Sequence, residues 1–96
     1  MILHTIIIKW KAGTSKSDID TALTGIKGLA GIDGVTDLAF GPVLRKEGQD
    51  FDFVLSMRVP SKEFLEQTYL PHPVHMRVVG SLGKMIGSAL IVDAEV

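Results

Sequence analysis

A chain of 96 residues with 46% hydrophobic and 22% charged side chains has the composition of one globular domain, spanning residues 1–96. The net charge of -1, with 10 basic and 11 acidic residues interspersed, argues against a nucleic-acid partner, and the lack of cysteine excludes disulfides and zinc–thiolate sites. No apolar run approaches the ~20 residues that span a bilayer. The N-terminus shows no signal-peptide pattern, so we expect a soluble cytoplasmic protein without a membrane partner.

The segment Ile2–Trp10 predicts a β-strand because it is rich in β-branched residues. Successive side chains of a strand point to opposite faces. One face therefore carries Ile2, His4, Ile6, Ile8 and Trp10, and the other carries Leu3, Thr5, Ile7 and Lys9.

A helix is predicted next. Ser17, followed by Asp20 three residues later, resembles a capping box at a helix start. Gly31 and Gly34 are expected to end the helix. Its apolar face is formed by residues at helical spacing, namely Ile19, Ala22, Leu23, Ile26, Leu29 and Ala30.

The middle of the chain predicts two strands joined by an exposed loop. Val35–Phe40 forms the first strand, and the charged segment Val43–Asp50 forms the loop. In Phe51–Val59 every second residue is apolar and most of the residues between them are polar, which indicates a strand with one buried face. That face carries Phe51, Phe53, Leu55, Met57 and Val59.

Two short helices are predicted after residue 60. Ser61 is expected to cap a helix that runs to Tyr69, where the following prolines disfavour helical backbone. Pro73 suits the first position of a new helix, which makes His72 its N-cap. This helix is expected to reach Gly87, with one stripe formed by His75, Val78, Val79, Leu82 and Ile86.

The last segment, Ala89–Val96, predicts a fourth strand and completes the order βαββαβ. This order is typical of a ferredoxin-like α+β fold, a four-stranded antiparallel sheet with both helices on one face. Because the other face stays open and apolar, we expect two subunits to pack these faces together as a two-fold homodimer. The open face is expected to carry Leu3, Thr5, Ile7, Val54 and Ile91.

The chain has three histidines, and two of them lie close to its single tyrosine in sequence. His75 and His4 share the apolar faces that point between helices and sheet, and Tyr69 can reach the mouth of the same space. An imidazole near a helix N-terminus is kept neutral by the helix dipole, so His75 is expected to act as a base. The candidate catalytic residues are thus His75, Tyr69 and His4, and the candidate ligand contacts are His72, Phe53, Leu55 and Ile6.

Each candidate also has a structural interpretation. His4 and His75 can be core residues that hydrogen-bond to each other, because buried polar groups need partners. His72 can accept a backbone N–H as a helix cap or face solvent. A three-histidine metal site is a further alternative, but no carboxylate is near His72 and His75 in sequence, so we expect no metal and no cofactor.

The chain resembles the stress-responsive A/B barrel (Dabb) family over nearly its whole length. The specific part is Tyr69-Leu70-Pro71-His72-Pro73-Val74-His75, a Tyr-x-x-His-Pro-x-His pattern. Further matches are Ile2-Leu3-His4, Ile8-Lys9-Trp10-Lys11, Gly34-Val35, Phe51-Asp52 and Val92-Asp93.

The resemblance implies a ferredoxin-like subunit that dimerises through its sheet into an α+β barrel. The family includes plant stress-induced proteins and a plant polyketide (olivetolic acid) cyclase, in which a cavity histidine and tyrosine promote aldol closure without a cofactor. By this resemblance His75 is a general base, Tyr69 donates a hydrogen bond to a carbonyl, and His4 and His72 support them. Two features depart from the cyclase: Phe53 stands where the cyclase has a further cavity histidine, and the chain has Pro71 inside the motif with one extra residue in the helix before it.

Three functions are consistent with these features. The first is a homodimer of unassigned activity that binds a small apolar molecule between helices and sheet. The alternative is a cofactor-free cyclase, isomerase or lyase that uses His75 as general base on a small carbonyl compound, for which we expect a cavity of roughly 300 Å³ or more. The third is a cofactor-independent oxygenase, for which no residue here indicates a substrate.

Overall fold

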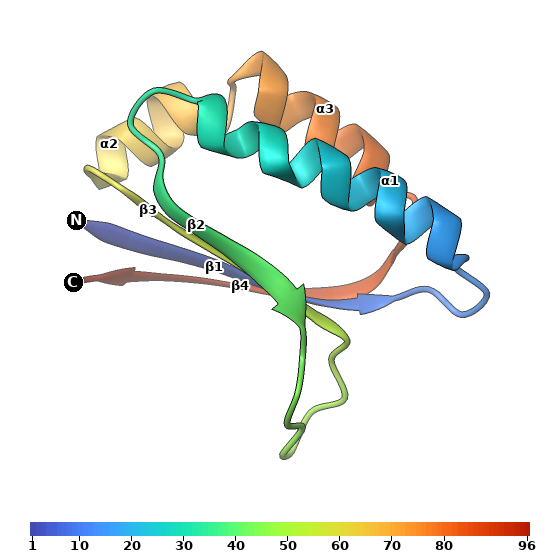
Figure 1. Ribbon diagram of the computed structural model, residues 1–96. Coiled ribbons are helices and arrows are strands. Elements are labelled where there is room, and N and C mark those ends of the chain that lie inside the picture. The colour runs from blue at the N-terminus through green and yellow to red at the C-terminus, as the bar shows by residue number, and fades with distance from the viewer.

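The computed structural model, which describes residues 1–96, places a layer of helices on one face of a four-stranded antiparallel sheet (Figure 1). The strand order is β2-β3-β1-β4, so the ferredoxin-like α+β fold is confirmed. The strands are β1 (Ile2–Trp10), β2 (Thr36–Pro42), β3 (Phe53–Val59) and β4 (Ile86–Glu95). The helices are α1 (Lys16–Lys27), η1 (Gly28–Gly31), α2 (Lys62–Phe64), η2 (Leu65–Tyr69) and α3 (Pro73–Leu82).

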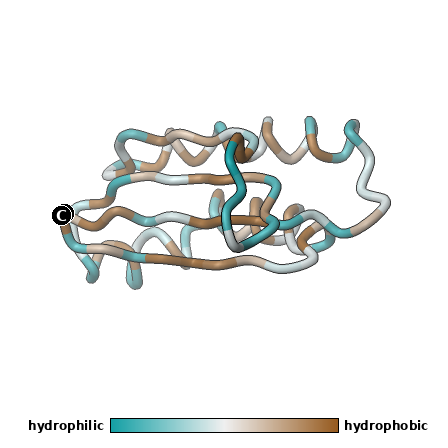
Figure 2. The backbone as a smooth tube through the Cα atoms, turned by 90° about the horizontal axis from the view of Figure 1, so that it is seen from below, coloured by the Kyte–Doolittle hydropathy of each residue, from teal (hydrophilic) through white to brown (hydrophobic).

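The two faces of β1 are those that alternation predicts, because His4 and Ile8 are buried under the helices. The face predicted for Ile91 is wrong. Ile91 pairs with Ile6 and therefore lies on the helix-covered face, whereas Leu90 pairs with Ile7 on the open face. A shift of one residue in the pairing of two strands moves every side chain of the shifted strand to the opposite face of the sheet. Figure 2 views the molecule from the open side.

The helix boundaries differ from the predicted ones at both ends of α1. Its N-cap is Ser15, whose side chain accepts a hydrogen bond from the backbone N–H of Asp18 at 3.1 Å, so the expected cap at Ser17 is wrong. The regular helix ends at Lys27, and the chain continues through Gly31 as the 3₁₀ helix η1. Glycine lowers α-helix stability, which agrees with this early end.

The start of α3 agrees with the prediction, and its end does not. Pro73 occupies the first turn, and His72 Nδ1 accepts a hydrogen bond from the N–H of Val74 at 3.1 Å. The helix ends at Leu82 rather than Gly87, with Gly83 as its C-cap. The chain then turns more tightly, and the N–H of Met85 donates to the carbonyl of Leu82 at 2.8 Å. Strand β4 therefore starts at Ile86, three residues earlier than expected.

The connection between β2 and β3, residues Val43–Asp52, projects from the open side of the sheet (Figure 1) and is called the arm below. Its base is fixed to β1: the N–H of Asp52 donates to the carbonyl of Ile8 at 2.8 Å, and the Asp52 carboxylate accepts from the N–H of Trp10 at 2.9 Å. These bonds end the arm, so β3 begins at Phe53 rather than Phe51.

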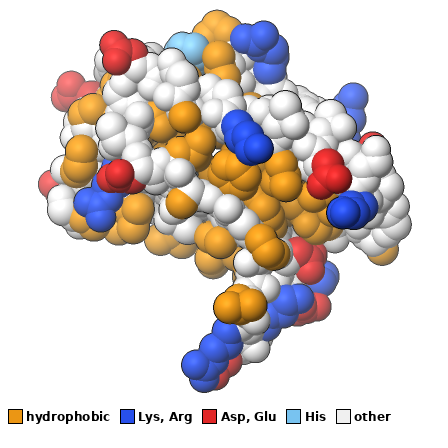
Figure 3. Space-filling model, in the orientation of Figure 1, with side chains coloured by type: hydrophobic (Ala, Val, Ile, Leu, Met, Phe, Trp, Pro, Cys, Tyr) orange, Lys and Arg blue, Asp and Glu red, His pale blue; other side chains and the backbone are white.

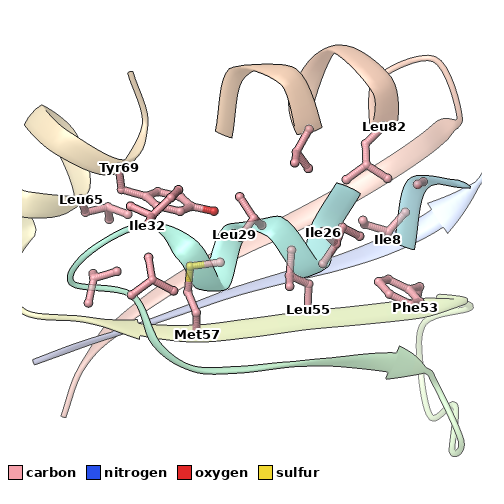
Figure 4. Close-up of a cluster of buried hydrophobic side chains, with 14 residues drawn as sticks. Ile8, Ile26, Leu29, Ile32, Phe53, Leu55, Met57, Leu65, Tyr69 and Leu82 are labelled. Carbon is pink, nitrogen blue, oxygen red and sulfur yellow. The ribbon is translucent and has the colours of Figure 1, made fainter. Parts of the chain in front are cut away.

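The core lies between the helices and the sheet (Figure 4). Ile8, Leu55 and Met57 from the strands pack against Ile26 and Leu29, and all five are almost fully buried. No helix has the length and hydropathy needed to cross a lipid bilayer.

Gly34 precedes β2 in a conformation that other residues rarely adopt, with φ of +101°, and a Cβ there would lie 2.6 Å from ring carbons of Phe64. Gly34→Ala is therefore expected to lower the free energy of unfolding by more than ~1 kcal/mol, measured from urea denaturation. Gly31→Ala is the matched control, because a Cβ at Gly31 meets no atom within 4 Å. Equal effects of the two substitutions would contradict this account.

Candidate functional site

A cavity of about 260 Å³ lies between the sheet, η2 and α3. Twelve of its 15 lining residues are hydrophobic, so its polar groups are few and distinct. They are His4, Tyr69 and His75, and they come from β1, η2 and α3. The volume is slightly below the ~300 Å³ expected for ligand sites. The cavity opens toward the sheet edge, because Ile91 on β4 is 61% exposed.

His4 is held in the wall of this cavity by Asp93. The two residues are opposite each other in the pairing of β1 with β4, and His4 Nδ1 is hydrogen-bonded to the Asp93 carboxylate. A carboxylate accepts, so Nδ1 carries the proton. The other ring nitrogen, Nε2, is buried and has no hydrogen-bond partner in the protein.

His75 has its tautomer set in the same way by the backbone. Its Nδ1 donates to the carbonyl oxygen of Leu70 at 2.7 Å, which leaves the lone pair on Nε2 when the ring is neutral. Burial lowers the pKa of His75 below its usual value of 6.5, and the nearby His4 and His72 lower it further, against the effect of the Leu70 bond. His75 is therefore neutral at pH 7 and chemically able to accept a proton.

Tyr69 lies between the two imidazoles. Its ring centroid is 5.6 Å from that of His4 and 4.6 Å from that of His75. It is the last residue of η2, a π-helical turn closed by the N–H of Leu70 and the carbonyl of Leu65. Figure 4 shows its hydroxyl pointing into the layer between helices and sheet. Burial raises its pKa to about 12, so the hydroxyl keeps its proton and can donate it.

The structure brings five of the seven predicted site residues to the cavity: His4, Tyr69, His75, Ile6 and Leu55. The other two, Phe53 and His72, do not line it. Phe53 lies at the end of the sheet where β1 finishes, packed against Trp10 with ring centroids 5.4 Å apart. The Nδ1 atom of His72 is already bonded as the cap of α3. The three histidines are also not gathered into a cluster that could hold a metal ion.

Asp93 is the site residue that sequence reasoning missed. It is an acidic residue in an otherwise apolar strand segment, Ala89–Ala94. That signal was available, but the register error that placed Ile91 on the open face placed Asp93 there as well. Only the pairing of β1 with β4 shows that Asp93 faces His4. His4 and His75 therefore do not need each other as partners, because each has its own.

A larger hollow of about 370 Å³ lies between α1 and α3, lined by Gly25, Gly28 and Arg77 among others. It contains no pair of acid and base groups. The chemically competent space is therefore the cavity under α3.

A family model described as the stress responsive A/B barrel domain matches residues 2–96. No curated protein matches the chain. Among solved structures, a dimeric ferredoxin-like protein of unknown function from Thermobifida fusca YX is similar, with 20% identity, a TM-score of 0.87, and coverage of 99% of this chain and 90% of that one. A Dabb family protein from Mesorhizobium loti has 23% identity and a TM-score of 0.84, with coverage of 99% and 95%. Hydroxynitrile lyase from Passiflora edulis has 14% identity and a TM-score of 0.86, with coverage of 99% and 92%.

Proposed function

The chain belongs to the stress responsive A/B barrel domain family, and we propose that it binds a small, mostly apolar molecule with one polar end in the cavity under α3. The observation that carries this proposal is His4 Nε2, a buried polar atom without a partner in the protein. An unsatisfied buried polar atom costs roughly 1–3 kcal/mol. Because Nδ1 carries the proton, Nε2 is an acceptor, and a ligand hydroxyl or N–H that donates to it removes this cost. The hydrophobic wall accommodates the rest of the molecule.

A second candidate function is cofactor-free proton transfer, with His75 Nε2 as the general base. The fixed tautomer and the lowered pKa of His75 favour it, because a base must be unprotonated at working pH. The Tyr69 hydroxyl, which stays protonated, is the donor to an oxygen on which negative charge develops. His4, oriented by Asp93, forms the cavity wall beside the Tyr69 ring.

The similarity in fold to a hydroxynitrile lyase supports one form of this chemistry. His75 Nε2 takes the hydroxyl proton of a cyanohydrin, and the oxygen electrons form the carbonyl group as the bond to the nitrile carbon breaks. The electron pair leaves with cyanide. The imidazolium of His75 returns the proton to cyanide, so the products are an aldehyde or ketone and hydrogen cyanide.

The open face of the sheet is the proposed interface of a homodimer. It carries Leu3, Ile7, Val54, Leu90 and Val92, the last two of which are 47% and 45% exposed. Apolar surface of this kind on a 96-residue chain is typical of an association site. The Thermobifida fusca neighbour is described as dimeric, which supports the same assembly here.

Binding is tested with benzyl alcohol as the probe, a small aromatic molecule whose hydroxyl can donate a hydrogen bond to His4 Nε2. Benzyl alcohol is expected to raise the Tm of the wild-type protein, and His4→Phe is expected to weaken its apparent affinity by about fivefold or more, which corresponds to the loss of roughly one hydrogen bond. His72→Asn is the matched control, because His72 lies outside the cavity and asparagine preserves the cap. No stabilisation of the wild type, or equal losses in both variants, contradicts the proposal.

The catalytic alternative is tested with mandelonitrile, by following benzaldehyde release above the buffer rate. Because the pKa of His75 lies below 6.5, the enzymatic rate is expected to be constant near pH 7 and to fall only in more acidic solution, where Nε2 is protonated. His75→Phe is expected to abolish the rate. Benzyl alcohol binding without mandelonitrile cleavage would support the binding function and contradict this form of the alternative.

A further inference from the structure

The cavity is open on one side, and that side is the β4 edge of the sheet. Ile86 and Ala89 line the end of the cavity nearest the start of β4, and Ala89 and Ile91 are exposed although they lie on the helix-covered face. No strand or helix of the same chain lies beyond β4. An apolar cavity with one missing wall is a poor container for an apolar guest, because the guest stays partly hydrated.

The arm has the properties of the missing wall. Its ten residues project from the open side of the sheet, and five of them are charged (Figure 3). Val43 and Phe51 are partly buried, whereas Leu44 is an apolar residue that is 99% exposed. The arm is held by ion pairs, with Asp50 bonded to both Lys9 at 2.9 Å and Lys46 at 3.1 Å. A projection that presents a fully exposed leucine is suited to contact with apolar surface outside its own subunit.

The length of the arm allows it to reach past a second sheet. Five residues in each direction extend at most ~17 Å. Two sheets packed face to face are ~10 Å apart. In the proposed dimer, the tip of an arm therefore passes the plane of the other sheet and reaches the level of the other subunit's cavity.

Symmetry decides which edge of the second sheet the arm meets. A two-fold axis parallel to the strands places β2 of one subunit beside β4 of the other, whereas an axis across the strands places β2 beside β2. The exposed residues of β2 are Thr36, Asp37, Ala39 and Pro42. An axis across the strands brings opposite strand ends together, so the arm would meet the Thr36–Asp37 end, which offers no apolar contact for Leu44. The β4 edge offers Leu90, Ile91 and Val92, 47%, 61% and 45% exposed.

We propose that the arm of each subunit closes the cavity of the other, with Leu44 of the partner subunit completing the wall beside Ile86 and Ala89. With the axis parallel to the strands, equivalent ends of the two sheets coincide. The arm leaves the sheet at the end where β1 finishes and β4 begins, because Asp52 is bonded to Ile8 and Trp10 there. This inference rests on the proposed sheet-to-sheet dimer, and it makes each site incomplete without the second copy.

Cysteine cross-linking tests this arrangement directly, because the natural chain contains no cysteine. Leu44→Cys combined with Ala89→Cys is expected to give a covalent dimer on mild oxidation, seen on a non-reducing gel. Leu44→Cys combined with Thr36→Cys is the matched control for the other symmetry and is expected to give no more dimer than Leu44→Cys alone. Disulfides form only where Cα atoms are within ~7 Å, so the pairs discriminate between the two axes.

The outcomes separate this inference from the dimer itself. A wild-type protein that is monomeric by light scattering at micromolar concentration overturns both. If the protein is a dimer but the Leu44→Cys/Ala89→Cys variant does not cross-link, only the arm arrangement is overturned. The same holds if the Leu44→Cys/Thr36→Cys variant cross-links instead. Leu44→Ser is also expected to weaken benzyl alcohol binding at least threefold without dissociating the dimer, whereas Gln49→Ser on the same arm leaves binding unchanged. If the Leu44→Cys/Ala89→Cys variant cross-links but Leu44→Ser binds the probe as tightly as the wild type, Leu44 does not close the cavity.

Discussion

Ile7→Glu is expected to convert the proposed dimer into a monomer. Ile7 lies on the open face of β1, directly between Val54 on β3 and Leu90 on β4. In a two-fold interface the substitution introduces two carboxylates into one apolar layer. Burying an unpaired ion costs several kcal/mol, and each 1.4 kcal/mol is a factor of ten, so the dimer dissociation constant should rise by about 10³ or more. Sedimentation velocity at micromolar concentration measures the change.

Met76→Glu is the control for Ile7→Glu. Met76 is 56% exposed on α3, on the helical layer rather than on the open sheet face, and the same charge there should leave the dimer intact. If both variants stay dimeric, subunits do not pack through the open face. If both become monomeric, the helical layer contributes to the interface instead.

Tyr69→Ala is expected to have the largest effect on stability. The Tyr69 side chain is completely buried among the core residues, and removing an aromatic ring from such a position costs about 3–5 kcal/mol. This is a large share of the ~5–15 kcal/mol that stabilises a typical domain. A shift of the urea midpoint to lower concentration, at unchanged slope, measures the loss.

Tyr69→Phe separates the ring from the hydroxyl. No hydrogen bond joins the hydroxyl to another group of the protein, so its removal should cost less than ~1 kcal/mol. The same variant should weaken benzyl alcohol binding, because the hydroxyl is the proposed hydrogen-bond donor to the ligand's oxygen. A Tyr69→Phe protein as unstable as Tyr69→Ala would mean that the hydroxyl is a structural group, and its proposed role in binding would then lose support.

The order of elements was predictable because it depends on local patterns. The alternating segments Ile2–Trp10 and Phe53–Val59 form strands. Pro73 lies in the first turn of α3 and His72 is its N-cap, as predicted from the fixed backbone of proline. The structure has the cap of α1 at Ser15 rather than at the predicted Ser17. Both serines fit the local sequence pattern, and only the hydrogen bond from the N–H of Asp18 distinguishes them.

The candidate site was predictable only in part. Local spacing placed His4 and His75 on buried faces, and the family pattern singled out Tyr69. Phe53 was assigned to the cavity because it shares a face with Leu55, but a strand face is longer than the cavity, and Phe53 lies beyond its end with Trp10.

The sequence by itself determined the type and order of the elements and the faces of β1 and β3, because side-chain periodicity follows from backbone geometry within each element. Tertiary structure alone decided the register of β4 on β1, which joins Asp93 to His4 across 89 positions and leaves the Nε2 atom of His4 buried without a hydrogen-bond partner. An alternating apolar strand can pair in either of two registers at similar local cost. The choice between them depends on contacts with residues far away in the chain, which no local pattern encodes.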